Sequence, residues 1–173
     1  GDMAKRWQMG YSPENRAFYR EWMAQHKLTD QIMVEAGIFS VADQDEQGRG
    51  GRTYPRWRHR LMFPIRNDNG DVIAFSGRLL DPEQKGGKYV NSPETPLFSK
   101  SRVLFGFDKS KRFISKAGQS IICEGQIDMI MVFEAGLQNV VAGQGTAFTE
   151  QHATMLKRLC NEVILCYDID AAG

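Results

Sequence analysis

The chain has 173 residues, of which 42% are hydrophobic and 25% charged, an ordinary composition for a globular protein. No apolar stretch approaches the roughly 20 residues that cross a bilayer, and no signal peptide is visible, so we expect a cytoplasmic protein with no membrane contact. Three cysteines without zinc-ligand spacing predict buried, reduced thiols and no zinc site.

The net charge of +1 hides a strong asymmetry along the chain. Residues 1–118 hold 20 Lys and Arg against 14 Asp and Glu, whereas residues 119–173 hold 2 against 7, which gives net charges of +6 and −5. A basic part joined to an acidic part suits an anionic polymer that lies on one and reacts at the other. The alternative, that these charges only solvate two surfaces, stays open on charge alone.

The first elements expected are a short strand over residues 5–11 and a helix over residues 13–27. Ser12 is a suitable N-cap for this helix because it precedes a proline, which is favoured at the first helical position. Phe18 and Trp22 are four residues apart and therefore share one helix face. We expect these aromatic side chains to pack in the core.

A second short helix, a loop and a hairpin are expected next. Thr29 is a suitable cap for the helix, and Gly37 is a suitable terminator. Residues 43–51 are polar and rich in glycine, which is typical of a loop. The apolar runs 61–65 and 72–76 flank an Asn-Gly pair, a strong hairpin signal.

From residue 109 onward the pattern becomes regular. A helix is expected over residues 109–116, ended by Gly118. Strands and helices then alternate, which predicts a parallel α/β unit with right-handed crossovers. The expected segments are, in order, 120–124, 126–136, 139–142, 150–160 and 162–167. We place a domain boundary between residues 118 and 119, where the charge balance also changes sign.

Four carboxylates follow two of the expected strands: Glu124 and Asp128 after the first, and Asp168 and Asp170 after the last. The carboxyl ends of parallel strands form the crevice where open α/β sheets bind ligands. Like charges gathered there repel unless a cation holds them, and several hard oxygen ligands suit Mg²⁺ or Mn²⁺. Each pair alone has a plainer interpretation, as acids at a helix N-terminus or as loop aspartates.

The glycine-rich segment after the middle strand is a candidate phosphate loop. Gly145 permits a close backbone approach, Thr146 offers a hydroxyl, and Thr149 is a suitable cap for the next helix. A plain turn between strand and helix explains the same residues without a ligand.

Arginines alternate with aromatic residues in the basic part. If this segment is extended, Arg56, Arg58 and Arg60 line one face, with Trp57 and His59 on the other. Guanidinium groups beside aromatic rings suit a phosphate backbone with stacked bases, although a solvated edge strand would look the same. Two further cations lie near glycine-bearing loops, Arg78 and Lys88.

Five motifs together resemble a known family. They are Arg-Leu-Met-Phe-Pro-Ile-Arg at 60–66, Phe-Ser-Gly-Arg at 75–78, Lys-Tyr-Val-Asn-Ser-Pro-Glu-Thr at 88–95, Glu-Gly-x-x-Asp at 124–128 and Asp-x-Asp-x-Ala-Gly at 168–173. In this order they resemble the RNA polymerase domain of bacterial-type DNA primases, and the last resembles the acidic motif of its Toprim part. The likeness runs over nearly the whole chain from about Lys5.

The resemblance implies an α/β fold, in which an α+β N-terminal primase-core subdomain (1–118) precedes the N-terminal portion of a parallel-sheet Toprim subdomain (119–173). It implies that Glu124 and Asp128 are catalytic and that Glu124, Asp168 and Asp170 hold Mg²⁺ or Mn²⁺. It further implies that basic and polar residues line the groove for nucleotide and template. These are Arg6, Arg78, Lys88 and Asn91.

Three departures from the family pattern stand out. Gln126 occupies a position where the family usually has an aromatic residue, and Ile169 replaces the usual glycine of Asp-Gly-Asp. The chain also ends at Gly173, before a further pair of aspartates, and it lacks the family's zinc-binding domain and its helicase-interaction domain. We therefore expect a fragment that has little activity alone and that reaches the replicative helicase only through the absent C-terminal domain.

The function expected from this resemblance is template-directed synthesis of short RNA primers on single-stranded DNA from ribonucleoside triphosphates, at the bacterial replisome. Two alternatives stay open on the sequence: a Toprim nuclease that acts on DNA, and a non-catalytic fragment that binds single-stranded DNA.

Overall fold

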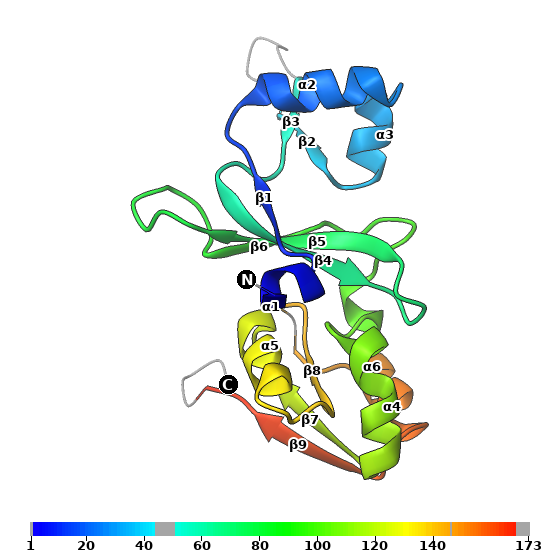
Figure 1. The fold of residues 1–173 in the computed structure, drawn as a ribbon. Coiled ribbons are helices and arrows are strands. Elements are labelled where there is room, and N and C mark those ends of the chain that lie inside the picture. Colours follow the sequence, from blue (N-terminus) through cyan, green and yellow to red (C-terminus); the bar gives the residue numbers. More distant parts are fainter. Residues whose placement is uncertain (1, 44–50, 146, 169–173) are drawn as a thin grey trace. The chain divides into compact units, whose positions relative to one another are not determined.

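We describe the protein from a computed structural model, which covers residues 2–43, 51–145 and 147–168. The chain divides into two compact units (Figure 1). The first unit holds residues 1–64 and 74–97, and the second holds residues 65–73 and 98–173. The expected boundary at residues 118 and 119 stays a prediction. No helix in the described part of the chain is long and apolar enough to span a membrane.

A four-stranded sheet has the strand order β1-β4-β5-β6. Its strands are β1 (Gly10–Ser12), β4 (Arg60–Arg66), β5 (Val72–Leu79) and β6 (Tyr89–Asn91). Strands β4 and β5 are neighbours, which confirms the expected hairpin. The side-chain oxygen of Asn67 accepts hydrogen bonds from two backbone N–H groups of the turn, at 3.0 and 2.9 Å, and thereby closes it.

Two helices and a two-stranded ribbon complete the first unit. They are α2 (Arg16–Gln25), α3 (Asp30–Glu35), β2 (Phe39–Val41) and β3 (Thr53–Pro55). The Thr29 side chain accepts from the Ile32 N–H, and Gly37 adopts a φ of 70°, so the predicted cap and terminator of α3 are confirmed. Met23, Met33 and Phe39 form the core beneath this pair of helices.

The start of the chain differs from the prediction in two respects. Residues 5–11 are not one strand, because α1 (Asp2–Arg6) precedes β1. Helix α2 begins after Asn15, whose side chain accepts from the Ala17 N–H at 2.8 Å, and not at Pro13. Phe18 and Trp22 are 53% and 38% exposed, so the prediction that they are core was wrong. The helix turns Met23 inward instead.

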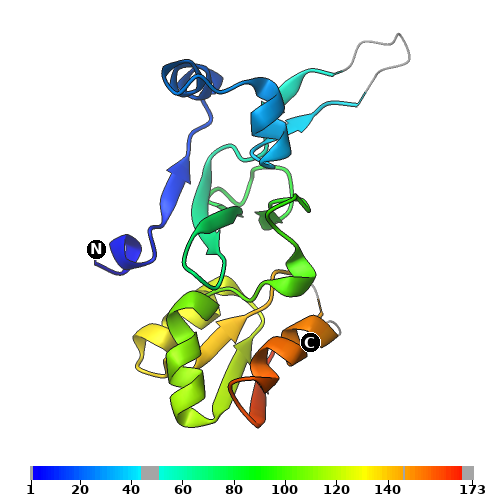
Figure 2. The same ribbon diagram turned by 90° about the vertical axis from the view of Figure 1, so that its right-hand side faces the viewer.

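The second unit is the predicted parallel α/β unit. Its elements are η1 (Lys100–Arg102), α4 (Phe107–Ala117), β7 (Gln119–Cys123), α5 (Gln126–Glu134), β8 (Val140–Ala142), α6 (Glu150–Lys157) and β9 (Glu162–Cys166). The sheet order is β8-β7-β9, with both neighbours parallel to β7. Because β8 and β9 flank β7 on opposite sides, right-handed crossovers place α5 and α6 on opposite faces of the sheet. Figure 2 shows α4 and α6 together on the near face.

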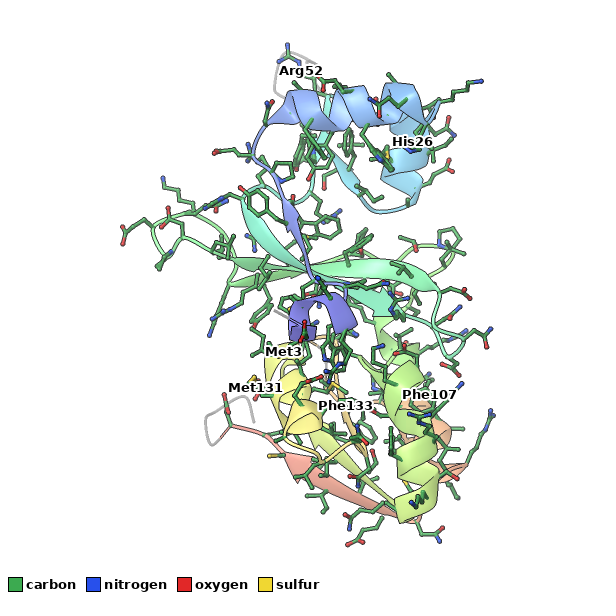
Figure 3. The ribbon with its side chains drawn as sticks, viewed as in Figure 1. Met3, His26, Arg52, Phe107, Met131 and Phe133 are labelled. Atoms are coloured by element: carbon green, nitrogen blue, oxygen red, sulfur yellow. The ribbon has the colours of Figure 1, made fainter. Side chains whose placement is uncertain are left out.

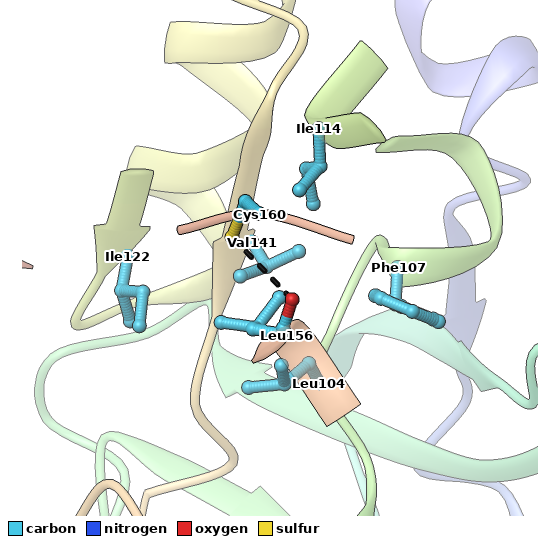
Figure 4. Packing of buried hydrophobic residues seen from close by; sticks show 7 residues of the cluster. All are labelled: Leu104, Phe107, Ile114, Ile122, Val141, Leu156 and Cys160. Atoms are coloured by element: carbon cyan, nitrogen blue, oxygen red, sulfur yellow. Dashed lines mark hydrogen bonds between the residues drawn. The ribbon is translucent and has the colours of Figure 1, made fainter. Parts of the chain in front are cut away.

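The core of this unit lies between the sheet and helices α4 and α6 (Figure 4). Ile122 and Val141 contribute from the strands, and Ile114 and Leu156 from the helices, each 1% exposed or less. On α5, Phe133 is 7% exposed, whereas Met131 is 56% exposed (Figure 3). Gly118 ends α4 with a φ of 65°, as predicted.

Buried His152 fixes the start of α6. Its Nδ1 accepts from the Thr149 N–H at 3.3 Å, and Thr149 Oγ1 accepts from the His152 N–H, so the predicted cap is a reciprocal capping box. The His152 Nε2–H donates to the Lys100 carbonyl at 3.1 Å and so joins α6 to η1. Burial lowers the pKa of this imidazole below its usual value.

Candidate active site

Three strand ends meet at one rim of the parallel sheet. Cys123, the last residue of β7, pairs with Ala142 of β8 and with Cys166 of β9. Glu124, Gly143 and Tyr167, which follow these residues, therefore leave the sheet side by side. Glu124 and the glycine turn after β8 thus lie at the same edge of the sheet, and the roles predicted for these residues stay predictions.

Glu124 lies in the turn after β7 and Asp128 in the first turn of α5, and both are exposed. A Cβ placed on Gly125, the N-cap of α5, would stand 2.5 Å from Asp128 Oδ2. The backbone of Gly125 is extended, with a φ of −109°, so the need for glycine here is lack of room and not an unusual conformation. The Asp128 carboxylate therefore lies next to Gly125, the residue that follows Glu124.

Asp168 joins the turn after β7 from the neighbouring strand. Its backbone N–H donates to Glu124 Oε2 at 3.3 Å, which places the two residues together at the rim. Tyr167 stands beside them, and burial together with the nearby Glu124 charge raises the pKa of its hydroxyl. Asp170 lies outside the described residues, so its predicted place near Asp168 stays a prediction.

The turn after β8 contains the candidate phosphate loop. Gly145 is exposed and has a φ of 70°, in the left-handed region that favours glycine. Thr146 lies outside the described residues. Next to Gly145, the side chain of Gln144 is fully buried and accepts a hydrogen bond from the Gln126 amide at 3.1 Å.

The donor chemistry of this rim fits a divalent cation, since exposed carboxylates are the hard ligands that Mg²⁺ and Mn²⁺ prefer. Glu124, Asp128 and Asp168 could supply such oxygens. Among residues 2–43, 51–145 and 147–168, however, no three His, Cys, Asp or Glu side chains gather closely enough to hold a metal ion.

Cys123, the last residue of β7, is buried next to the rim. Burial chiefly, and then the neighbouring Cys166 thiol and Asp128 carboxylate, raise the pKa of its thiol to about 11. A thiol in that state is neutral at physiological pH and a poor nucleophile. Cys123 and Cys160 are buried, whereas Cys166 is exposed, so the prediction of buried thiols holds for two of the three.

The predicted alignment of Arg56, Arg58 and Arg60 on one face requires an extended strand. Residues 56–59 are not part of a strand, and β4 begins only at Arg60, so this condition is not met. Arg60 is 5% exposed, and its Nη1 donates to the carbonyls of Gly77 and Gly87 at 2.9 and 3.0 Å. Arg56 is half-buried, and its Nε donates to the Gly37 carbonyl at 3.2 Å. Burial lowers the pKa of both guanidinium groups. The hydrogen bonds that both arginines donate to backbone carbonyls therefore stabilise the folded structure.

The other predicted nucleic-acid residues lie on or beside the sheet of the first unit. Arg58 and Lys88 are exposed, and Lys88 directly precedes β6. Arg78 on β5 and Asn91 on β6 are half-buried. Arg6 is exposed at the end of α1. Arg6, Arg58 and Lys88 are thus the exposed cations of this set, and Arg78 is half-buried.

Two features of the rim had no signal in the sequence. Tyr167 was predicted as the last residue of a strand, and its position beside Glu124 follows only from the pairing of β7 with β9. The buried pair of Gln126 and Gln144 joins residues 18 apart in the chain, and glutamine is normally a surface residue.

Comparison with known proteins now identifies the family. Residues 1–111 match the N-terminal domain of the DNA primase catalytic core, and residues 121–173 match the Toprim-like family. The chain belongs to the DNA primase family. The resemblance found in the sequence is thereby confirmed, and the family is one of DNA-directed RNA polymerases. These matches do not favour the alternative of a Toprim nuclease.

Bacterial primases are among the relatives that match this chain. The DNA primase of Listeria monocytogenes is 43% identical over 171 residues, which cover 99% of this chain and 26% of that protein. The DNA primase of Staphylococcus epidermidis is 36% identical over 172 residues, with 99% and 28% coverage. The chain therefore spans about a quarter of the length of these relatives.

Solved primase structures share the fold. The RNA polymerase domain of Mycobacterium tuberculosis primase DnaG matches with a TM-score of 0.85 and 32% identity, over 99% of this chain and 56% of that one. A DnaG primase catalytic domain bound to single-stranded DNA matches with a TM-score of 0.81 and 33% identity, over 99% and 51%. Both confirm the predicted α/β fold class.

Proposed function

We propose that this chain forms part of the catalytic core of a DNA primase, which synthesises short RNA primers on a single-stranded DNA template from ribonucleoside triphosphates. The observation that carries the proposal is the meeting of Glu124 and Asp168 at one rim, directly beyond the ends of the adjacent strands β7 and β9. Family membership supplies the reaction class, and the rim supplies carboxylates where open α/β sheets bind ligands.

The reaction joins a 3′-hydroxyl to the α-phosphorus of a nucleotide, and pyrophosphate leaves. A bound Mg²⁺ or Mn²⁺ would stabilise the negative charge that develops on the phosphoryl oxygens. We assign Asp168 and Asp170 to holding the cation together with Glu124. Glu124 and Asp128, exposed just before α5 and in its first turn, are the candidates to accept the proton of the attacking hydroxyl.

We assign the exposed cations of the first unit to the template and the triphosphate. Arg58 and Lys88 would contact phosphate oxygens, and Arg6, Arg78 and Asn91 would line the same path. Binding through such contacts weakens as salt rises, because the protein displaces counterions from the nucleic acid. The proposal places the protein at the replisome in the cytoplasm and assigns helicase contact to other parts of the primase.

The 173 residues alone should bind single-stranded DNA weakly and synthesise little or no primer. In this proposal, further ligands from the remainder of a primase complete the site. A chimera supplies that remainder: this chain replaces the 171 matching residues in the Listeria monocytogenes primase. Primer synthesis by the chimera, and not by residues 1–173, is the expected result.

The decisive variant is Glu124→Gln in the chimera, because it removes the charge and keeps the shape. We expect primer synthesis to fall at least a hundredfold, within the range by which acid–base and charge-stabilising groups contribute. Glu162→Gln is the matched control, since Glu162 is also exposed but begins β9 at the opposite rim, where it accepts a hydrogen bond from Gln119. Primer synthesis at the parental rate by Glu124→Gln would remove Glu124 from the mechanism.

A further inference from the structure

Two buried amides lie beneath the rim that carries the carboxylates. Gln126 is the first residue of α5 and is 5% exposed, and Gln144 follows β8 and is 0% exposed. Gln126 Nε2 donates to Gln144 Oε1 at 3.1 Å. A buried amide is costly unless it is hydrogen-bonded, so this contact is a built feature of the site.

The amide pair joins two of the three strand ends. Gln126 begins α5, directly after the turn that follows β7, and Gln144 belongs to the turn after β8, beside the glycines of the candidate phosphate loop. On the other side, the Asp168 N–H donates to Glu124 Oε2 and joins the turn after β7 to that after β9. The turn after β7 is therefore bonded to both of its neighbours.

Gln126, the first residue of α5, lies between the two carboxylates in the sequence. Gln126 lies two residues after Glu124 and two before Asp128, and both carboxylates are exposed to solvent. Gly125 between them has no side chain with which to pack. The buried Gln126 side chain therefore links the start of α5, between the two carboxylates, to the neighbouring strand end.

We propose that Gln126 and Gln144 are positioning residues for the active site. Their hydrogen bond sets where Glu124 and Asp128 stand relative to the glycine turn after β8, and thereby sets the affinity of the rim for a divalent cation. This inference rests on the proposed function, because it assigns a role to residues beneath the same site.

The test uses methionine, which has nearly the shape of glutamine but lacks both the amide N–H that Gln126 donates and the amide oxygen with which Gln144 accepts. The variants are Gln126→Met, Gln144→Met and the double variant, with Gln151→Met, at an exposed position of α6, as the control. Urea denaturation measures stability, electron paramagnetic resonance measures the affinity for Mn²⁺, and NMR measures hydrogen exchange of the Asp168 amide. All three use the 173-residue chain.

We expect each single variant to lower the urea midpoint, because one buried amide loses a hydrogen bond, and the double variant to cost less than the sum of the two single losses. Mn²⁺ affinity should fall about tenfold or more in all three, as when partners that orient metal ligands are removed. Exchange of the Asp168 amide should be faster in all three, because Glu124 is no longer held. The control should match the parent in every measurement.

A double variant that recovers stability, Mn²⁺ affinity and slow Asp168 exchange together would overturn the inference, since packing alone would then explain the pair. Parent protein that binds no Mn²⁺ would instead count against the proposed metal site, and the exchange rate would still decide the positioning role. If the double variant does not fold, Gln144→Met alone decides. Gln144 lies on a different turn from both carboxylates, so an unchanged Asp168 exchange rate there would refute the role.

Discussion

Gly125→Ala is expected to separate activity from stability. The new Cβ would stand 2.5 Å from Asp128 Oδ2, whereas ordinary contacts begin near 3.4 Å. The carboxylate must therefore move by about 1 Å, and a misplacement of that size costs on the order of a hundredfold in rate. The backbone at Gly125 suits alanine, and the only atom in the way ends a side chain, so the free energy of unfolding should stay within about 1 kcal/mol of the parent.

The assay for Gly125→Ala has two parts. Urea denaturation of the 173-residue chain gives the free energy of unfolding, and primer synthesis by the Listeria chimera gives the rate. Gly10→Ala is the matched control, because its Cβ would meet only Met62 Cβ, at an ordinary distance of 4.0 Å. Parental primer synthesis by Gly125→Ala, or a loss of stability large enough to explain the lost rate, would refute this reasoning.

Three further predictions concern titration, reactivity and the basic residues. Burial in the folded protein lowers the pKa of His152, whereas His152 of the unfolded chain binds a proton near pH 6.5. The free energy of unfolding should therefore be constant above about pH 6.5 and fall below it. His152→Asn should lessen this fall, as measured by the urea midpoint at each pH. With a thiol reagent at pH 8, one cysteine, Cys166, should react fast, and Cys123 and Cys160 slowly; two fast thiols would contradict the burial pattern. Arg60→Ala should lower the free energy of unfolding by about 2–4 kcal/mol, because it removes buried charged hydrogen bonds. Arg58→Ala should change the free energy of unfolding by less than about 0.5 kcal/mol. Arg58→Ala should also weaken the binding of single-stranded DNA, which fluorescence anisotropy measures.

The second unit was predictable because its signals are local. Gly118 and Thr149 mark helix ends through their own backbone and hydroxyl chemistry, and the alternation of strand and helix needs no knowledge of the tertiary structure. Parallel strands then bring Glu124 and Asp168 to one edge by geometry alone.

The features that the sequence did not predict depend on distant partners. The burial of Arg60 follows from the carbonyls of Gly77 and Gly87, which reach it only after β4, β5 and β6 pair. The four-residue spacing placed Phe18 and Trp22 on one helix face, but spacing alone does not tell which face of α2 meets the core. The face that packs in the core carries Met23 and Tyr19. The pairing of Gln126 with Gln144 likewise requires β8 to lie beside β7.

We propose that Glu124 and Asp168 share a divalent cation at the rim of the parallel sheet. The test is an anomalous difference map from a crystal of this chain soaked in Mn²⁺. We expect a peak about 2.0–2.3 Å from carboxylate oxygens of both residues. A well-occupied Mn²⁺ bound elsewhere on the chain, with the rim left empty, would contradict it.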